Sequence, residues 1–214
     1  MRVLIGCERF GRVRDAFRTL GHDAWSCDMV PDATASPHHL HCDVLAVLDH
    51  GWDLAIFHPD CTYLTNSAAW AYTDGPYHQK VKPDTLTGAN RRQARSAAIR
   101  FALKLWKAPI PRIAIENPIG CLSSSPMGRP QQIIQPWQFG DDASKATCLW
   151  LNGLLPLRHT VMIKPRMVNG RPRWANQTDS GQNRLSPSDT RAMDRAATWP
   201  GIAAAMAQQW GGQT

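Results

Sequence analysis

The chain has 214 residues, and its 24 Lys and Arg outnumber 17 Asp and Glu, which gives a formal net charge of +7. This length is typical of one domain with a sizeable core, and a hydrophobic content of 43% excludes a disordered chain. No apolar run is long enough to span a membrane, and charged residues interrupt the N-terminal stretch too early for a signal peptide. We therefore expect a cytoplasmic protein without membrane association.

The basic residues are spread over the chain rather than gathered in a tail. They predict a folded basic surface, and nucleic acid is the first polyanion to consider as a partner. The alternative is a soluble enzyme that is basic for unrelated reasons. The basic groups are Arg12, Arg14 and Arg18; Arg91, Arg92, Arg95 and Arg100; and Lys164, Arg166, Arg171, Arg173 and Arg184.

The first part of the chain alternates strand and helix patterns. Short apolar runs predict buried strands, and apolar residues at i, i+4 and i+7 predict one face of a helix. In chain order we expect a strand over 2–6, a helix over 12–20, a strand over 22–28, a Pro/His-rich loop over 29–42, a short helix or turn over 43–48 and a strand over 52–57.

The rest of the chain continues this alternation. We expect a polar, aromatic loop over 62–90, a helix over 91–107, strands over 112–115, 133–139 and 147–151, an irregular basic segment over 152–184, a helix start at Ser186-Pro187-Ser188-Asp189 and a last helix over 202–210. This order predicts an α/β fold with a mostly parallel sheet and helices on both faces. Ligands of such sheets bind at the carboxyl ends of the strands.

The six cysteines contain no CxxC pair, so we expect thiols rather than disulfides or a zinc site. Cysteines and histidines are crowded at Cys27, His38, His39, His41 and Cys42, but their spacing matches no zinc pattern. No metal is therefore expected.

The turn after the first strand, Gly6 to Val13, has the G-x4-G spacing of a phosphate loop. Arg12 stands where that loop needs lysine, and Val13 where it needs a hydroxyl, so we reject this interpretation. A strand–turn–helix that presents backbone amides to a nucleoside cofactor remains, with Asp28 near the ribose. The alternative is that the glycines only shape a tight turn.

Two chemical groups stand at the ends of predicted strands. Cys61 follows one strand within His58-Pro59-Asp60-Cys61-Thr62, and Glu116 ends another within Ile115-Glu116-Asn117-Pro118. A thiol and a carboxylic acid at neighbouring strand ends suit attack on an electrophilic ring together with protonation of that ring.

These motifs resemble those of DNA cytosine-5 methyltransferases. Pro59-Asp60-Cys61 resembles the Pro-Cys motif of that family, and Glu116-Asn117-Pro118 its Glu-Asn-Val motif. LIGCERFG resembles a reduced cofactor motif, Ser144 to Thr147 stands at the Gln-x-Arg position, and 185–201 resembles the late helix. The combination of HPxCTYL, ENP and KATCLWL is most similar to short, phage-type members.

The resemblance implies a Rossmann-like methyltransferase fold that uses S-adenosylmethionine. It implies Cys61 as nucleophile, Glu116 as ring-binding acid and Asn117 as the residue orienting the loop. The thiolate also needs positive potential, which Lys145 or Arg184 would supply. The implied cofactor contacts are Cys7, Glu8, Phe10, Gly11, Asp28, Met29, Asp43 and Pro59.

The resemblance also implies a division of the chain and a partner. Residues 1–151 and 185–214 would form the catalytic domain, and 152–184 a small basic target-recognition insert. The partner would be double-stranded DNA with a flipped cytosine, contacted through Lys164, Arg166, Arg171, Arg173 and Arg184. We expect a monomer that is encoded by a phage or prophage and acts in the cytoplasm of a bacterial host.

The aromatic residues of loop 62–90 (Tyr63, Trp70, Tyr72 and Tyr77) would close over the flipped base, or would only pack the loop.

Asp60 departs from the family pattern, in which a second proline is usual at this position. A carboxylate beside the nucleophile raises the pKa of the thiol. Two alternatives therefore stay open. One is a related one-carbon transferase acting on pyrimidines of DNA or nucleotides, and the other is a catalytically inactive DNA-binding protein.

Overall fold

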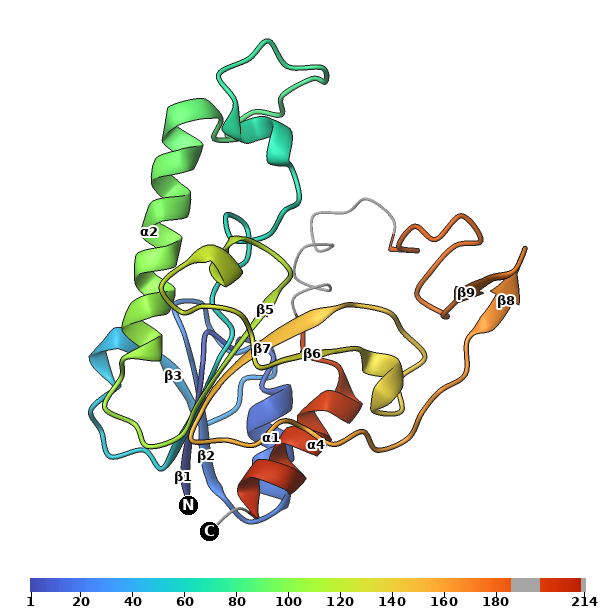
Figure 1. The fold of residues 1–214 in the computed structure, drawn as a ribbon. Coiled ribbons are helices and arrows are strands. Elements are labelled where there is room, and N and C mark those ends of the chain that lie inside the picture. Colours follow the sequence, from blue (N-terminus) through green and yellow to red (C-terminus); the bar gives the residue numbers. More distant parts are fainter. Residues whose placement is uncertain (186–196, 213–214) are drawn as a thin grey trace.

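The computed structural model describes residues 1–185 and 197–212. A seven-stranded sheet forms its centre, in the order β3-β2-β1-β4-β5-β7-β6 (Figure 1). The strands are β1 (Arg2–Gly6), β2 (Asp23–Asp28), β3 (His39–His41), β4 (Leu54–Phe57), β5 (Ile113–Pro118), β6 (Gln132–Ile134) and β7 (Thr147–Asn152). The strands from β3 to β5 are parallel, whereas β7 is antiparallel to both of its neighbours.

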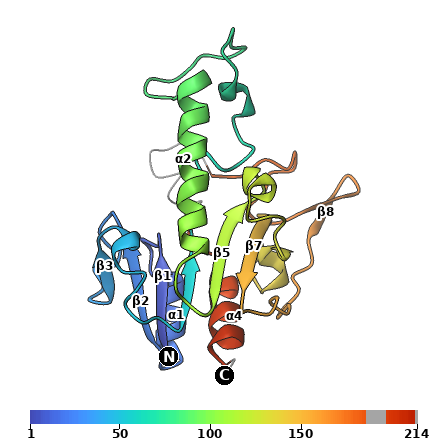
Figure 2. The same cartoon turned by 60° about the vertical axis from the view of Figure 1, so that its left-hand side comes forward.

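Helices cover both faces of this sheet. One face carries α1 (Arg12–Thr19) and α4 (Pro200–Gly211), and the other carries α2 (Gly88–Trp106), as Figure 2 shows. Within the described residues, four short 3-10 helices lie in the connections, at Val44–Ala46, Ala69–Tyr72, Cys121–Ser124 and Pro136–Gln138. The order of the first five strands is that of a Rossmann fold. The predicted Rossmann-like α/β class, mostly parallel with helices on both faces, is confirmed.

The core follows from the alternation of side chains along buried strands. In β1, Val3 and Ile5 pack toward α1 and α4, while Leu4 packs into the second core beside α2. Successive strand residues point to opposite faces, so a continuous apolar run fills both cores. This explains why the uninterrupted apolar runs of the sequence became the central strands.

Two expectations for the edge strands were wrong. The predicted loop 29–42 contains β3, whose histidine rings His39 and His41 reach the carbonyls of Val30 and Met29 at 3.1 and 3.0 Å. The strand predicted over 133–139 is only β6, because Pro136 begins a 3-10 helix there. Proline has no N–H to give to a ladder and is favoured at a helix start.

The segment 152–184, termed the insert, is less irregular than predicted. It contains the hairpin of β8 (Arg166–Val168) and β9 (Arg171–Arg173), which lies away from the sheet in Figure 1. Trp174 stacks on Trp137 with ring centroids 5.6 Å apart, and the Asn176 side chain bonds both backbone groups of Ser144. The predicted helix start at 186–189 lies outside the described residues.

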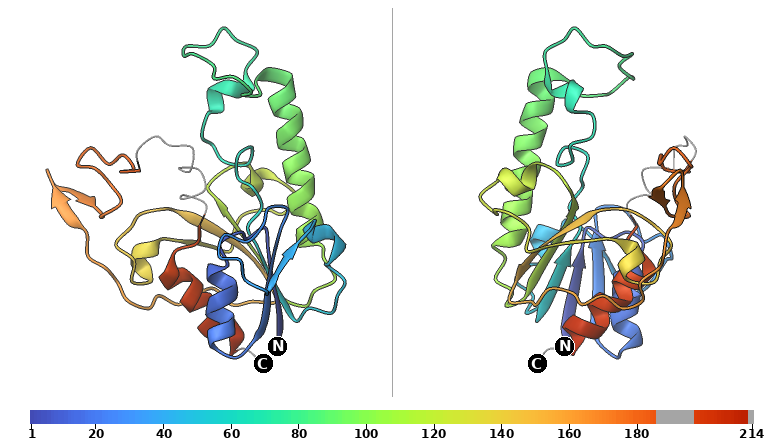
Figure 3. Two further views of the ribbon diagram at one scale, coloured as in Figure 1. Left: turned by 180° about the vertical axis from the view of Figure 1, so that it is seen from behind. Right: turned by 45° about the vertical axis from the view of Figure 1, so that its right-hand side comes forward.

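The helix α2 projects beyond the carboxyl ends of the strands, and the short helix Ala69–Tyr72 and the loop that follows it lie at its far end (Figures 1 and 3). The insert rises on the other side of the same edge. Among residues 1–185 and 197–212, no helix has the length and apolar character needed to cross a bilayer.

The expectation of a basic surface was wrong at two positions. The Arg14 side chain is fully buried and pairs with Asp32 and Ser26, and Arg91 is 6% exposed under the loop after Cys61. Both guanidinium groups therefore hold loops in place rather than face solvent.

Candidate active site at the ends of β4 and β5

The candidate site begins where two adjacent parallel strands end. Phe57 of β4 pairs with Ile115 of β5, so the next residues, His58 and Glu116, come out side by side. His58 Nδ1 lies 2.8 Å from Glu116 Oε2, and the two side chains are about nine-tenths buried. Sequence reasoning treated Glu116 as a site residue and passed over His58. The signal for His58 is its position directly after β4, beside the part of β5 that carries Glu116.

The protonation of this pair follows from its surroundings. Burial alone raises the pKa of the Glu116 carboxyl, but the hydrogen bond from His58 and the charge of Lys145 outweigh burial, so the pKa is lowered. An ionised carboxylate only accepts hydrogen bonds. His58 Nδ1 therefore donates its N–H to Glu116.

The loop that carries Cys61 is fastened to the end of β5. The Asn117 side-chain amide donates to the Pro59 carbonyl at 2.8 Å, and the Cys121 N–H donates to the Leu64 carbonyl at 2.8 Å. A Cβ at Gly120 would lie 2.0 Å from the Leu64 oxygen, so only glycine permits this approach. Asn117 is thus hydrogen-bonded to the loop that carries Cys61, the loop that we expected Asn117 to orient.

Cys61 lies in a turn that its own neighbours shape. Its carbonyl accepts the N–H groups of Leu64 and Thr65, while Asp60 Oδ1 accepts both the N–H and the hydroxyl of Thr62. Burial raises the pKa of the Cys61 thiol, Asp60 and Glu116 raise it further, and Lys145 opposes them. The net result is a thiol with a raised pKa.

Lys145 is a cation that acts on both groups, because its positive charge lowers the pKa of the Cys61 thiol and of the Glu116 carboxyl. Its backbone N–H is held by the Gln135 side chain at 2.8 Å. A small pocket lies beside the Glu116 and Lys145 side chains, with Thr198 and Trp199 before α4 as its other wall. Trp199 is a second site residue that sequence reasoning did not name.

The proposed cofactor residues divide into an acidic edge and a turn. Burial raises the pKa of Cys7 to about 12, and the negative charges of Asp28, Asp43 and Asp60 add to this effect. Asp28 Oδ1 accepts the Val30 N–H and Asp43 Oδ1 accepts the Leu45 N–H. Each of these two carboxylates uses one oxygen to shape its own turn. Met29 is 68% exposed at the same edge.

The turn after β1 is less open to a ligand than expected. Both Cys7 and Glu8 give their N–H groups to the Cys27 carbonyl. The buried Glu8 carboxylate accepts the Val13 and Arg14 N–H groups at 2.7 and 3.2 Å, so it satisfies the first turn of α1 rather than facing a cofactor. We therefore correct the expectation for Glu8.

Gly11 has a left-handed φ of 65°, and a Cβ there would meet the Arg14 guanidinium. Close packing of Arg14 thus explains this glycine without a ligand. Phe10, next to Gly11 in the same turn, is partly buried. Pro59 is buried, with its carbonyl on Asn117.

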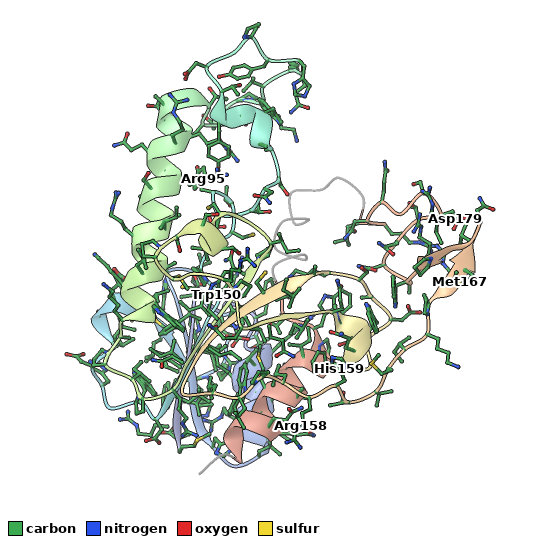
Figure 4. The ribbon with its side chains drawn as sticks, viewed as in Figure 1. Arg95, Trp150, Arg158, His159, Met167 and Asp179 are labelled. Atoms are coloured by element: carbon green, nitrogen blue, oxygen red, sulfur yellow. The ribbon has the colours of Figure 1, made fainter. Side chains whose placement is uncertain are left out.

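The aromatic residues after Cys61 pack against α2. The Arg95 guanidinium lies 3.4 Å from the centroid of the Tyr72 ring, and Arg91 lies 4.8 Å from the same ring. Arg95, labelled in Figure 4, also donates to the carbonyls of Tyr63 and Thr65. Tyr63 and Tyr72 therefore follow the loop-packing interpretation. Trp70 and Tyr77 pack edge to face on each other.

The basic residues of the insert have two kinds of surroundings. Arg166 bonds Asp179, Arg173 bonds the Asp179 carbonyl, and Arg184 bonds the Gln177 carbonyl. Asp179 and Met167 mark this part of the insert in Figure 4. Lys164 and Arg171 are exposed.

No group of three or more His, Cys, Asp or Glu that could hold a metal ion occurs within residues 1–185 and 197–212. Comparison with protein-family models and with curated proteins finds no match.

Comparison with solved structures finds, among others, a prophage-encoded E. coli protein described as a candidate DNA modification methyltransferase. It is 12% identical, with a TM-score of 0.42 over 71% of this chain and 46% of that chain. A mutant of Spodoptera frugiperda DNMT2 is 14% identical, with a TM-score of 0.42 over 80% of this chain and 57% of that chain. The chain spans about half the length of these structures.

Proposed function

We propose that the protein is a DNA cytosine-5 methyltransferase that uses S-adenosylmethionine and forms a covalent adduct through Cys61. The observation that carries this proposal is the His58–Glu116 hydrogen bond where β4 ends beside β5, with Cys61 close enough for the charges of Glu116 and Lys145 to act on its thiol. A thiol nucleophile, a hydrogen-bonded acid group and a cation are the groups that addition to a pyrimidine ring requires.

The reaction would begin with addition of the Cys61 thiolate to C6 of cytosine. The Sγ–C6 bond forms, the C5=C6 electron pair shifts toward N3, and N3 takes up a proton. The Glu116 carboxylate then accepts hydrogen bonds from the N3–H and the exocyclic amine. The activated C5 would then take the methyl group of the bound cofactor, which is left as its thioether. Release of the N3 proton, transfer of the C5 proton to a water molecule and expulsion of the Cys61 thiolate would restore the aromatic ring. Lys145 favours the thiolate, because its charge lowers the pKa that burial and Asp60 raise.

The acidic edge around Cys7 fits the chemistry of S-adenosylmethionine. This cofactor, when bound, supplies an activated methyl group on a sulfonium cation, and its ribose hydroxyls and adenine amine are hydrogen-bond donors. The carboxylates of Asp28 and Asp43 are acceptors, and with Asp60 they create the negative potential that a cation favours. We assign Asp28 to the ribose and Asp43 to the adenine, with Phe10, Gly11, Met29, Cys7 and Pro59 around them.

The DNA would lie over the carboxyl edge, between the loop on α2 and the insert (Figure 1). In this proposal residues 1–151 and 185–214 form the catalytic domain and the insert contacts DNA. A cytosine must leave the duplex stack to reach Cys61, which costs a few kcal/mol.

Mass spectrometry of nucleosides tests the proposal. DNA incubated with the protein and S-adenosylmethionine should gain 5-methyldeoxycytidine, and Cys61→Ser should abolish this product. Cys121→Ser is the matched control, because Cys121 is also partly buried and its Sγ lies 3.9 Å from the Tyr63 carbonyl. A methylated base other than 5-methyldeoxycytidine, or equal activity of Cys61→Ser, would contradict the proposal.

The raised pKa of Cys61 favours one second candidate, an inactive DNA-binding protein. That candidate predicts retention of duplex DNA in gel-shift experiments without any methylated nucleoside. The same two measurements therefore separate both functions.

A further inference from the structure

His58 has a ring whose two nitrogens are in different situations. Nδ1 donates to Glu116 Oε2 at 2.8 Å, while Nε2 is buried and has no hydrogen-bond partner among the described residues. A buried ring nitrogen without a partner is unusual, because most buried polar atoms are satisfied. The ring therefore holds one nitrogen against the Glu116 carboxylate and leaves the other outside the hydrogen bonds of the described residues.

Titratable groups from several elements of the fold surround the His58 ring. Glu8, in the turn before α1, and Glu116, at the end of β5, are the two glutamates of the sequence, and both are buried. Burial raises the pKa of Glu8, and His58 opposes this effect, so the ring attracts both carboxylates. Farther groups of the same site are Cys7, Asp60, Cys61 and Lys145.

The cytosine-5 reaction needs a proton that Glu116 alone is poorly suited to hold. Addition of a thiolate to C6 places negative charge on the ring, which N3 relieves by taking a proton. The hydrogen bond from His58 and the charge of Lys145 outweigh burial and lower the pKa of Glu116, so its carboxyl is ionised when the substrate arrives. Another group must therefore carry the proton.

We propose that His58 supplies this proton and acts through Glu116, a role that rests on the proposed function of the site. In this step His58 starts as an imidazolium with a proton on each nitrogen. It gives the Nδ1 proton to the Glu116 carboxylate, and the acid so formed gives that proton to N3 as the Sγ–C6 bond forms. His58 is then neutral, Glu116 is a carboxylate again, and the ring is a neutral adduct protonated at N3. When the Sγ–C6 bond breaks, the proton returns along the same path.

This role separates His58 from a residue that merely positions Glu116 by a hydrogen bond. Asn at position 58 can present an amide N–H near the place of Nδ1, but it cannot release that proton. The experiment therefore compares His58→Asn and His58→Ala with the unmodified protein. It measures tritium released to water from DNA that carries [5-³H]cytosine, in the presence of S-adenosylmethionine.

The expected result is a loss of about 100-fold or more in both variants, the usual size of a proton-transfer contribution. Free imidazole should raise the rate of the His58→Ala variant at least tenfold. Pyrazole has the same shape but stays unprotonated at neutral pH, so it should restore nothing. The control is His38→Ala, since His38 also has a buried ring nitrogen without a partner but packs on Trp25. Melting temperatures establish that each variant is folded.

The outcomes distinguish the inference from the proposed function. A folded His58→Asn within threefold of the unmodified rate, or equal rescue of His58→Ala by pyrazole and imidazole, overturns the role of His58 and leaves the function intact. Failure of the unmodified protein to release tritium or to make 5-methyldeoxycytidine overturns the proposed function, and the role of His58 with it.

Discussion

Asp60 has opposite effects on the turn and on the nucleophile. Its Oδ1 accepts the N–H and the hydroxyl of Thr62, which shapes the turn that holds Cys61. Its negative charge, after burial, raises the pKa of the Cys61 thiol. A raised thiol pKa lowers the thiolate fraction at pH 7, and the thiolate is the reactive form. Methyl transfer should therefore increase with pH until the thiol is ionised.

We predict that Asp60→Asn increases the reactivity of Cys61. The amide oxygen still accepts from Thr62, but the charge is gone. A partly exposed charge pair contributes about 0.2–1 kcal/mol, so alkylation of Cys61 by iodoacetamide at pH 7 should accelerate by roughly 1.5- to 5-fold. Peptide mass mapping measures the rate at each cysteine.

Asp49→Asn serves as the control for Asp60→Asn, because Asp49 is 81% exposed and lies outside the site. Asp49→Asn should leave the rate of Cys61 alkylation unchanged. Slower alkylation of Cys61 in Asp60→Asn would show that the carboxylate favours the thiolate, the opposite of the expected effect.

The turn that carries Cys61 depends on a helix that follows it in sequence. Arg95 of α2 bonds the carbonyls of Tyr63 and Thr65 and stacks on Tyr72, while Arg91 bonds the Thr62 carbonyl. The planar guanidinium makes the stack and the forked hydrogen bonds together, which an ammonium cannot do. The projecting end of α2 is therefore a support for the active-site loop.

We predict that Arg95→Lys loosens residues 62–72 while the sheet stays intact. Loss of the stack and of one hydrogen bond should cost about 1–2 kcal/mol locally. Hydrogen exchange of these amides should accelerate by roughly 5- to 30-fold. Arg100→Lys, on the exposed side of the same helix, is the control. Unchanged exchange at 62–72 in Arg95→Lys would show that the loop is held by other contacts.

The elements predicted correctly from sequence are those with an unambiguous pattern. The runs at β1, β4 and β7 are apolar without interruption, and α1 shows its helical spacing, because each is buried against a core. β3 was missed because two of its three residues are histidines, held by side-chain bonds that no periodicity reveals. The antiparallel insertion of β7 between β5 and β6 depends on packing and left no sequence signal.

The site was predictable in part for the same reason. Cys61 and Glu116 follow recognisable strands, so their common edge could be inferred. The pairing of His58 with Glu116 requires the register of β4 against β5, which only tertiary structure provides. The burial of Arg14 and Arg91 was also hidden, since an arginine in a sequence favours the surface.

At the scale of the whole molecule, the insert limits how much sequence can be read. It is short, it leans on residues 135–145 through Trp174 and Asn176, and it uses Arg166, Arg173 and Arg184 for its own contacts. Exposed cations of the insert, Lys164 and Arg171 among them, suit phosphates and position DNA without specifying bases.

We predict a short or relaxed target of about two or three base pairs, because each good base contact discriminates by only about 1–3 kcal/mol. Bisulfite sequencing of a plasmid treated with the protein measures the target. Methylation confined to one six-base-pair site would show that the insert reads far more sequence than these side chains allow. Binding should weaken steeply as salt rises.

The stack of Trp137 and Trp174 has a spectroscopic consequence. The chain has nine tryptophans, and among the described residues this is the one stacked indole pair, with 20° between the ring planes. Two indoles this close couple their electronic transitions, which gives a paired signal in circular dichroism that isolated indoles lack. Because one ring belongs to the insert and the other lies near Lys145, that signal provides a label-free report of whether the insert stays docked when DNA arrives.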